Sequence, residues 1–208
     1  YYITVNRVAC QVMVYAKSET GKYDIPVKTF TCSVGLPGTP TPTGTFTTPA
    51  KYRWHTLMGP SYGQYCTRIV GGVLFHSVAG SNMTSHNLSA GNYNMLGQPA
   101  SHGCVRLCVR DAKWIYDNCA LGTTVTISDT AAMLFDKPAT IKIPAGQDWD
   151  PTDPSKKNPY RKQKATLTVA KKKAKTAEYR TSYNVKSGVT AKDKITKKSL
   201  TKNITYTT

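Results

Sequence analysis

Residues 101–107 read Ser-His-Gly-Cys-Val-Arg-Leu, which places a cysteine directly after a histidine and a glycine. The thiolate is the reactive form of cysteine, and a thiol with its ordinary pKa of about 8.5 supplies little thiolate at neutral pH. A neighbouring imidazole that accepts the thiol proton removes this limitation. Gly103 accepts a positive φ, so the chain can turn sharply and offer the N–H groups of Gly103 and Cys104 to an oxyanion. The heptapeptide therefore predicts a cysteine nucleophile for acyl transfer.

Two histidines upstream are candidates for the base. His76 follows an apolar run that predicts a strand, Gly71-Gly72-Val73-Leu74-Phe75, and 24 residues separate it from Ser101. His86 is nearer, with 14 residues between it and Ser101, but it lies in the polar stretch 80–87, which has no strand pattern. A base must be held rigidly, so we favour His76 and keep His86 as the alternative.

Three segments resemble the YkuD-type catalytic domain of the L,D-transpeptidases of bacterial cell walls. They are the motif at 101–106, the strand Val73-Leu74-Phe75-His76-Ser77, and the turn Thr41-Pro42-Thr43-Gly44-Thr45-Phe46. The resemblance covers roughly residues 1 to 130. It implies a mainly β fold, in which a β-sandwich carries a short helix after the cysteine and a groove across one face.

The resemblance also implies a reaction. Members of the family attack the L-to-D bond between residues three and four of a peptidoglycan stem tetrapeptide, release D-alanine, and pass the acyl group to an amine of a neighbouring stem. Carbapenems acylate the same cysteine. Two alternatives stay open: an L,D-carboxypeptidase that uses water as acceptor, and a non-catalytic protein that binds the cell wall or polyanions. No cofactor is implied.

Carried over residue by residue, the resemblance makes Cys104 the nucleophile and His76 the base, with the carbonyl of Ser77 orienting the His76 ring. His102 and Gly103 would frame the oxyanion site together with Cys104.

Substrate contacts are expected at Ser101, at Arg106, which would also steady the loop, and at Tyr93. The family usually places fewer residues between its base and the motif serine. We therefore interpret residues 78–100 as an insertion that forms a lid over the groove and carries Tyr93 and Met95.

Zinc is the rival explanation for the histidines and Cys104. Structural zinc sites use close pairs of ligands, and only His102 and Cys104 are that close, so we predict no metal site. Among the other cysteines, Cys10 and Cys32 are a candidate disulfide pair. They are equidistant from Gly21 in a hairpin predicted from the alternating runs 3–15 and 25–34.

We predict a catalytic domain at 1–154, a linker at 155–163 and a small β-rich module at 164–208. A helix is predicted over 110–118. The C-terminal module resembles the early strands of bacterial immunoglobulin-like repeats, and the closing strands of such a repeat are missing after Thr208.

The net charge of +17 is distributed unevenly. Residues 1–150 carry 12 Lys and Arg against 8 Asp and Glu, whereas residues 151–208 carry 16 against 3. No nucleic-acid motif accompanies the basic tail, so anionic wall polymers are its expected partner, beside the stem peptides. No apolar run approaches 18 residues, and the chain starts at Tyr1. We expect a secreted monomer at a Gram-positive-type wall. We interpret the chain as a fragment whose export signal or anchor has been removed.

Overall fold

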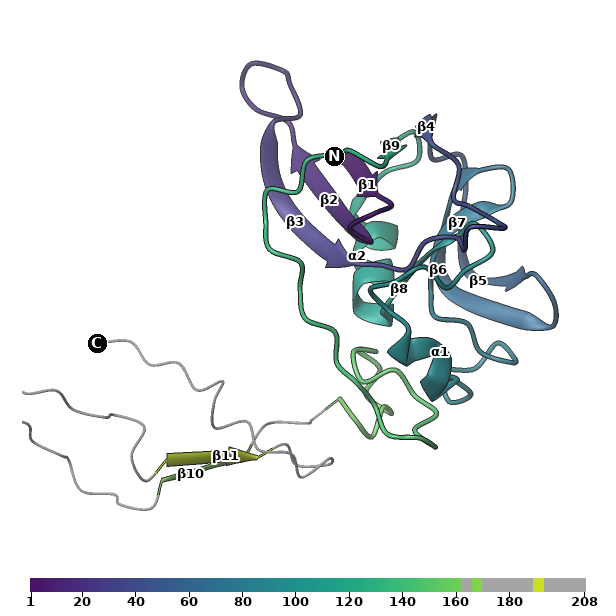
Figure 1. Cartoon of the computed structure of the whole chain (residues 1–208), viewed down its shortest axis with the longest axis vertical. Coiled ribbons are helices and arrows are strands. Elements are labelled where there is room, and N and C mark those ends of the chain that lie inside the picture. The colour runs from purple at the N-terminus through teal and green to yellow at the C-terminus, as the bar shows by residue number, and fades with distance from the viewer. Residues whose placement is uncertain (162–165, 170–188, 193–208) are drawn as a thin grey trace, which may run out of the picture. The chain divides into compact units, whose positions relative to one another are not determined.

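The computed structural model describes residues 1–161, 166–169 and 189–192, and the chain divides into the units Tyr1–Asn158 and Pro159–Thr208 (Figure 1). The first unit is mainly β, with two sheets and two helices among its described residues, which confirms the predicted fold class. The predicted boundaries at 154 and 163 stay predictions.

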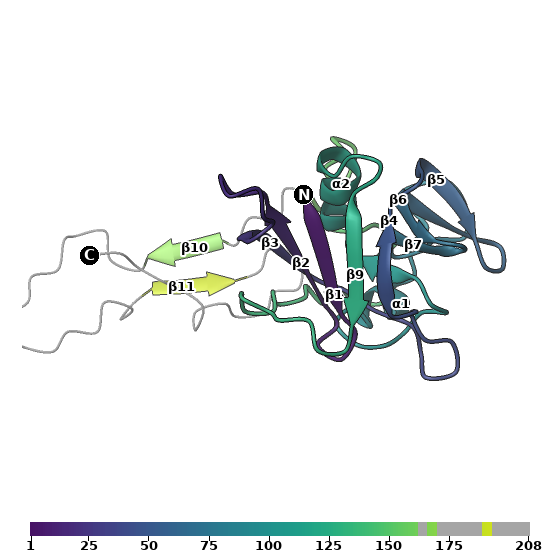
Figure 2. The ribbon, with the colours of Figure 1, turned by 90° about the horizontal axis from the view of Figure 1, so that it is seen from above.

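The first sheet has five strands in the order β3-β2-β1-β9-β4, which Figure 2 shows side by side. Their bounds are β1 Tyr2–Asn6, β2 Gln11–Ala16, β3 Ile25–Thr31, β4 Gly44–Thr47 and β9 Thr124–Ser128. The pair β1 and β9 is parallel and the other pairs are antiparallel. The N-terminal and C-terminal parts of the domain therefore close on each other at the centre of this sheet.

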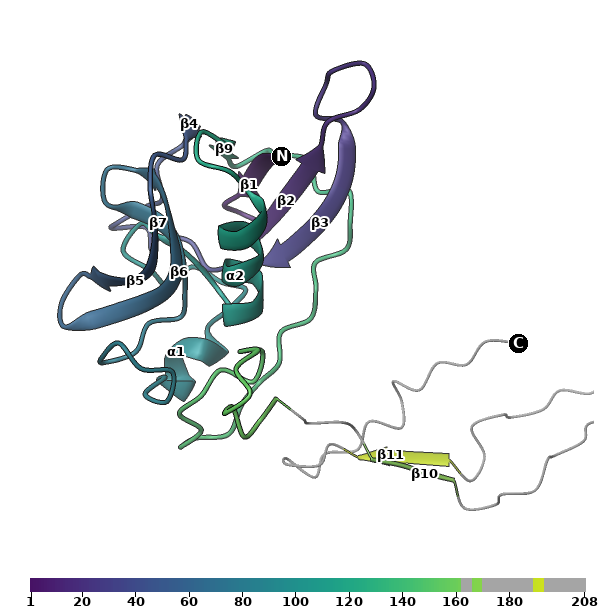
Figure 3. The ribbon, with the colours of Figure 1, turned by 180° about the vertical axis from the view of Figure 1, so that it is seen from behind.

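The second sheet runs in the order β5-β6-β7-β8. Its strands are β5 Lys51–Leu57, β6 Ser61–Val70, β7 Val73–Ser77 and β8 Val105–Leu107. Helix α2, Val109–Asn118, follows β8 directly and contacts β6, β7 and β8 (Figure 3). Its buried side chains Val109, Ala112 and Ile115 join residues of both sheets in one core. The predicted helix after the cysteine is thus confirmed.

The run 3–15 folds differently from the prediction. It forms two strands, because the chain turns back between Asn6 and Gln11. The Asn6 side chain accepts a hydrogen bond from the Ala9 N–H at 2.8 Å, and Cys10 adopts a φ of 50°. Asparagine favours such turns because its side chain can bond the backbone a few residues on. Because apolar residues recur throughout 3–15, the sequence pattern does not indicate this turn.

Cys10 and Cys32 do lie opposite each other, as their spacing predicts. The β2–β3 register pairs Gln11 with Thr31, and the Cys32 N–H donates to the Cys10 carbonyl at 3.0 Å. Both side chains are buried free thiols in this structure, so the bridge itself stays a prediction.

The segment after β9 runs without regular structure along β1, β2 and β3 (Figure 1). Side chains of the sheet bond its backbone: Asn6 Nδ2 donates to the Ala131 carbonyl at 2.8 Å and Gln11 Nε2 to the Phe135 carbonyl at 2.9 Å. The segment is therefore part of the first unit.

The buried carboxylate of Asp150 fixes the start of α2. It accepts a hydrogen bond from the Val109 N–H at 2.7 Å and another from the Thr152 N–H at 2.7 Å. An acidic side chain here satisfies an N–H group that the helix itself leaves unpaired. Because α2 follows the motif strand β8, this contact also anchors the motif.

In the second unit, β10 (Thr166–Val169) and β11 (Val189–Lys192) pair antiparallel. The rest of the segment predicted to form an immunoglobulin-like module, and most of the basic tail, lie outside the described residues. No helix in the described ranges is long and apolar enough to cross a bilayer.

Replacing Asp150 tests the anchoring of α2. We expect Asp150→Ala to lower the free energy of unfolding by about 2 kcal/mol, because a buried helix cap is lost, and the melting temperature by roughly 4–8 °C. Thermal unfolding followed by circular dichroism measures this. The control is Asp148→Ala, which changes an exposed acid two residues away. Equal melting temperatures for the two variants would show that Asp150 does not anchor the helix.

Candidate active site

The parallel pairing of β7 with β8 brings the two halves of the site together. Phe75 pairs with Val105 and His76 with Arg106, so the end of β7 lies beside the motif that precedes β8. A cavity of about 300 Å³ opens at this point. Its walls come from β5, β6, β7 and the motif turn, and its polar lining includes the side chains of His55, Arg68, His76, His102, Cys104 and Arg106.

His76 is held in one tautomer. Its side chain is 2% exposed, and Nδ1 lies 2.5 Å from the carbonyl oxygen of Ser77. A carbonyl only accepts hydrogen bonds, so Nδ1 carries the proton and Nε2 keeps a lone pair. Gly63 on β6 makes room for the ring, because a Cβ there would lie 3.0 Å from Nδ1.

Burial lowers the pKa of His76 to about 4. The Ser77 hydrogen bond opposes this shift, whereas the charges of Arg106 and His55 add to it. His76 is therefore a neutral base at neutral pH.

Cys104 is the one half-buried cysteine, and the other five are buried. Burial raises the pKa of the Cys104 thiol. The backbone of Leu74 and the guanidinium groups of Arg106 and Arg68 act in the opposite direction. Sγ donates a hydrogen bond to the Gly72 carbonyl at 3.5 Å. The resting thiol is thus protonated, and it needs a base at the moment of attack.

The hydroxyl of Ser101 shapes the motif turn. It donates to the Cys104 carbonyl at 2.6 Å and accepts from the Gly103 N–H at 3.2 Å. Gly103 adopts a φ of 110°, the left-handed region that the sequence predicts for it. The expectation that the Gly103 N–H is free for an oxyanion is wrong, because Ser101 occupies it. The Cys104 N–H has no hydrogen-bond partner within the described part of the chain and stays available.

Arg106 and His102 also reach the cavity. Arg106 Nη1 donates to the Ala100 carbonyl at 2.8 Å, and its backbone pairs with Ser33. These contacts tie the motif to its neighbours, in line with the loop-steadying position expected for Arg106. His102 is exposed at the rim of the cavity.

The family model of the L,D-transpeptidase catalytic domain, YkuD, matches residues 1–127. The chain belongs to the YkuD family. YciB of Bacillus subtilis (strain 168), assigned by name to the L,D-transpeptidases, is 40% identical over 93 residues, which cover 42% of this chain and 46% of YciB.

Solved structures similar to the chain include one from Clostridium acetobutylicum and one from Mycobacterium tuberculosis. One, from Clostridium acetobutylicum ATCC 824, is described as a fused Zn-dependent amidase, peptidase and peptidoglycan-binding protein. It is 28% identical with a TM-score of 0.47, and the match covers 61% of this chain and 51% of the Clostridium protein. The other, an L,D-transpeptidase from Mycobacterium tuberculosis H37Rv, is 24% identical with a TM-score of 0.46. The match covers 61% of this chain and 57% of the transpeptidase. The chain thus spans about half the length of these relatives.

Not every residue predicted to contact the substrate lines the cavity. Tyr93 on α1 (Ala90–Asn94) is 2% exposed and packs with Val78, Leu96, Cys108 and Ile143 in a second small core. A substrate-binding role for Tyr93 therefore has no support in the geometry of the cavity. Of the segment 78–100, only Ala79 lines this cavity. A neighbouring cavity shares Ser61, Ala79 and Arg106 with it and is lined by further residues of the segment, so the lid stays a prediction.

His86 lies away from the cavity as well. It is exposed, and its ring centroid lies 5.7 Å from that of Trp149. Of the two candidates for the base, geometry therefore favours His76. Within the described ranges, no group of three or more His, Cys, Asp or Glu side chains is arranged to hold a metal ion.

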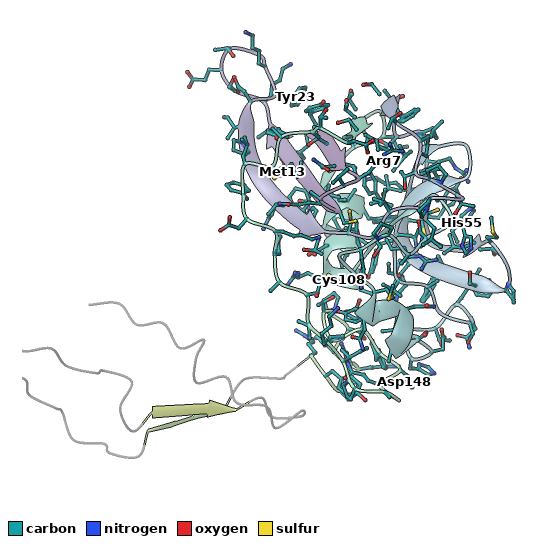
Figure 4. All side chains as sticks on the ribbon, in the orientation of Figure 1. Arg7, Met13, Tyr23, His55, Cys108 and Asp148 are labelled. Carbon is teal, nitrogen blue, oxygen red and sulfur yellow. The ribbon has the colours of Figure 1, made fainter. Side chains whose placement is uncertain are left out.

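Two basic residues of this cavity were not predicted from the sequence, His55 on β5 and Arg68 on β6. Figure 4 shows His55 on the β5–β6 side of the unit. The hairpin β5–β6 precedes β7 directly, and its Lys51–Leu57 and Ser61–Val70 segments pair antiparallel. That proximity in sequence to the strand of His76 was the available signal.

A titration of the histidine rings by NMR tests the environment of His76. We expect one ring to titrate near pH 4, because burial disfavours its cation. Between pH 6.5 and about 4 the unfolded chain binds a proton that folded His76 does not, so the free energy of unfolding should fall as the pH falls through this window. His55→Gln, His86→Gln and His102→Gln variants assign the three remaining signals. A His76 signal that titrates at pH 6.5 or above would contradict the buried neutral base.

Proposed function

We propose that this chain is a cysteine peptidyltransferase that cross-links peptidoglycan stem peptides through a thioester on Cys104. One observation carries the proposal: a half-exposed thiol shares a cavity with a buried imidazole whose Nε2 lone pair is fixed by the Ser77 carbonyl. This is the arrangement that a protonated thiol needs in order to become a nucleophile at neutral pH.

In the first half of the reaction, His76 Nε2 takes the proton from Cys104 Sγ, and the sulfur attacks the carbonyl of the third stem residue. The tetrahedral oxyanion accepts a hydrogen bond from the free Cys104 N–H. His76 then returns the proton to the nitrogen of the departing D-alanine, and the acyl group stays on sulfur as a thioester.

In the second half, an amine of a neighbouring stem attacks the thioester. His76 Nε2 accepts the amine proton and returns it to the sulfur as the new amide forms. Water in place of the amine would give the carboxypeptidase product, so the acceptor alone decides between the two outcomes.

The charge of the cavity supports an anionic substrate. Arg68 and Arg106 line it, and no Asp or Glu of the described residues does. Stem peptides carry carboxylates, so the cavity and such a substrate are complementary in charge. The basic tail would add attraction to anionic wall polymers, and we propose that the reaction takes place at the wall outside the cell.

Product analysis on a synthetic stem tetrapeptide, with and without an amine acceptor, tests the proposal. We expect release of D-alanine together with a cross-linked product. Cys104→Ala should abolish both, and His76→Ala should slow D-alanine release by about 100-fold or more, the usual contribution of a general base. The matched control is His86→Ala, which removes a histidine outside the cavity and should leave the rate unchanged.

Other outcomes are equally informative. Tripeptide as the sole product, even at high acceptor concentration, would assign the carboxypeptidase reaction. Retained binding to cell walls with no D-alanine release from folded protein would assign the non-catalytic alternative. A larger loss of D-alanine release rate in His86→Ala than in His76→Ala would identify His86 as the base.

A further inference from the structure

Three side chains of the β5–β6 hairpin form a stacked group at the cavity wall. The rings of Tyr52 and His55 are stacked, with centroids 4.3 Å apart and an interplanar angle of 13°. The Arg68 guanidinium lies 5.6 Å from the centroid of the Tyr52 ring, and its Nη2 lies 3.3 Å from His55 Nε2. Arginine only donates hydrogen bonds, so His55 Nε2 is the acceptor. The group therefore holds the Arg68 guanidinium in a defined place.

This guanidinium has no acidic partner within the described part of the chain. The ion pairs found there join Arg7 to Asp129, Arg110 to Asp111 and Lys113 to Asp117. Arg68 uses one N–H toward the Gly71 carbonyl and one toward His55. A guanidinium has five N–H donors, so three remain. Arginine donors in a fixed planar arrangement suit a carboxylate, which can accept two of them at once.

The position of Arg68 relative to the thiol narrows the choice of ligand. Arg68 donates to the carbonyl of Gly71, and Cys104 Sγ donates to the carbonyl of the next residue, Gly72. The guanidinium and the nucleophile are thus bound to neighbouring peptide groups of one turn. A carboxylate on Arg68 would belong to a residue immediately beside the bond that Cys104 attacks.

In the proposed reaction, only the leaving residue has a carboxylate this close. Its carboxylate carbon is separated from the attacked carbonyl carbon by one nitrogen and one Cα. The other side of the attacked bond carries the rest of the stem, which continues as a peptide.

We propose that Arg68, held by His55 and Tyr52, binds the terminal carboxylate of the leaving D-amino acid and thereby selects donor stems that end in a free carboxylate at the fourth residue. The inference rests on the proposed function. Arg68 is a specificity-determining residue in this account, and His55 is a positioning residue.

A pair of substrates tests this assignment on the full chain. The rate of release of the fourth residue is measured for a stem tetrapeptide with a free terminal carboxylate and for the same peptide as its C-terminal amide. We expect the native protein to prefer the acid by roughly 10- to 100-fold in kcat/KM, the usual worth of a hydrogen-bonded charge pair. Arg68→Gln should lose this preference, because release from the acid peptide slows while release from the amide does not. Arg68→Lys should keep part of the preference.

The matched control is Arg53→Gln on the neighbouring strand. The Arg53 guanidinium stacks on Tyr65 at 3.9 Å from the ring centroid and does not line the cavity. This variant should keep the preference of the native protein. An equal loss of acid and amide turnover in Arg68→Gln would mean that Arg68 supports the structure only, and equal turnover of acid and amide by the native protein would also overturn the assignment.

A binding measurement separates this inference from the proposed function. Calorimetric titration of Cys104→Ala with the acid and with the amide reports the carboxylate preference without turnover. Tighter binding of the acid, lost on adding Arg68→Gln, would support the carboxylate site even if the native protein released no D-alanine. Equal binding of the two peptides would overturn the site even if the native protein were an active transpeptidase.

Discussion

The hydrogen bond between His76 Nδ1 and the Ser77 carbonyl is the constraint on which the site depends. It spans 2.5 Å inside a buried environment and leaves Nε2 as the only basic position of the ring. The fold supplies the conditions for it. The parallel pairing of β7 with β8 places His76 beside the motif, and Gly63 leaves the space that the ring occupies. A neutral imidazole of fixed tautomer then faces the cavity that contains Cys104.

The electrostatics of the cavity follow from the same burial. Because burial raises the pKa of Cys104 and lowers that of His76, the resting pair is a thiol and a neutral imidazole, without charge separation. The cavity nevertheless carries positive charge through Arg68 and Arg106. A negative charge that develops on sulfur or on an oxyanion would be stabilised only when the reaction creates it. The thiol of such a neutral pair depends on His76 to accept its proton at the moment of attack.

The sequence was most informative where chemistry is local. The motif at 101–107 predicted the turn at Gly103, and the apolar run before His76 predicted a strand that the structure contains as β7. It was least informative where the pairing of distant segments decides which side chains reach the cavity or are buried. Arg68 and His55 reach the cavity because β5, β6, β7 and β8 form one sheet, and the sequence indicates this only through the short distance between the hairpin and the strand of His76. Tyr93 lies in a polar segment, yet packing against Ile143, fifty residues further on, buries it. The Ser101 bond to the Gly103 N–H likewise depends on a side-chain rotation that no motif specifies.

Acylation by a carbapenem tests the central claim, that the buried base His76 activates Cys104, most directly. Intact mass of the protein after incubation, followed by peptide mapping, should show a single adduct on Cys104, because the other five cysteines are buried. The rate of acylation should stay nearly constant from pH 7 down to about pH 5, since His76 remains neutral above its pKa of about 4. An adduct on another residue, no adduct on folded and reduced protein, or a rate that already falls steeply near pH 6.5 would contradict the account.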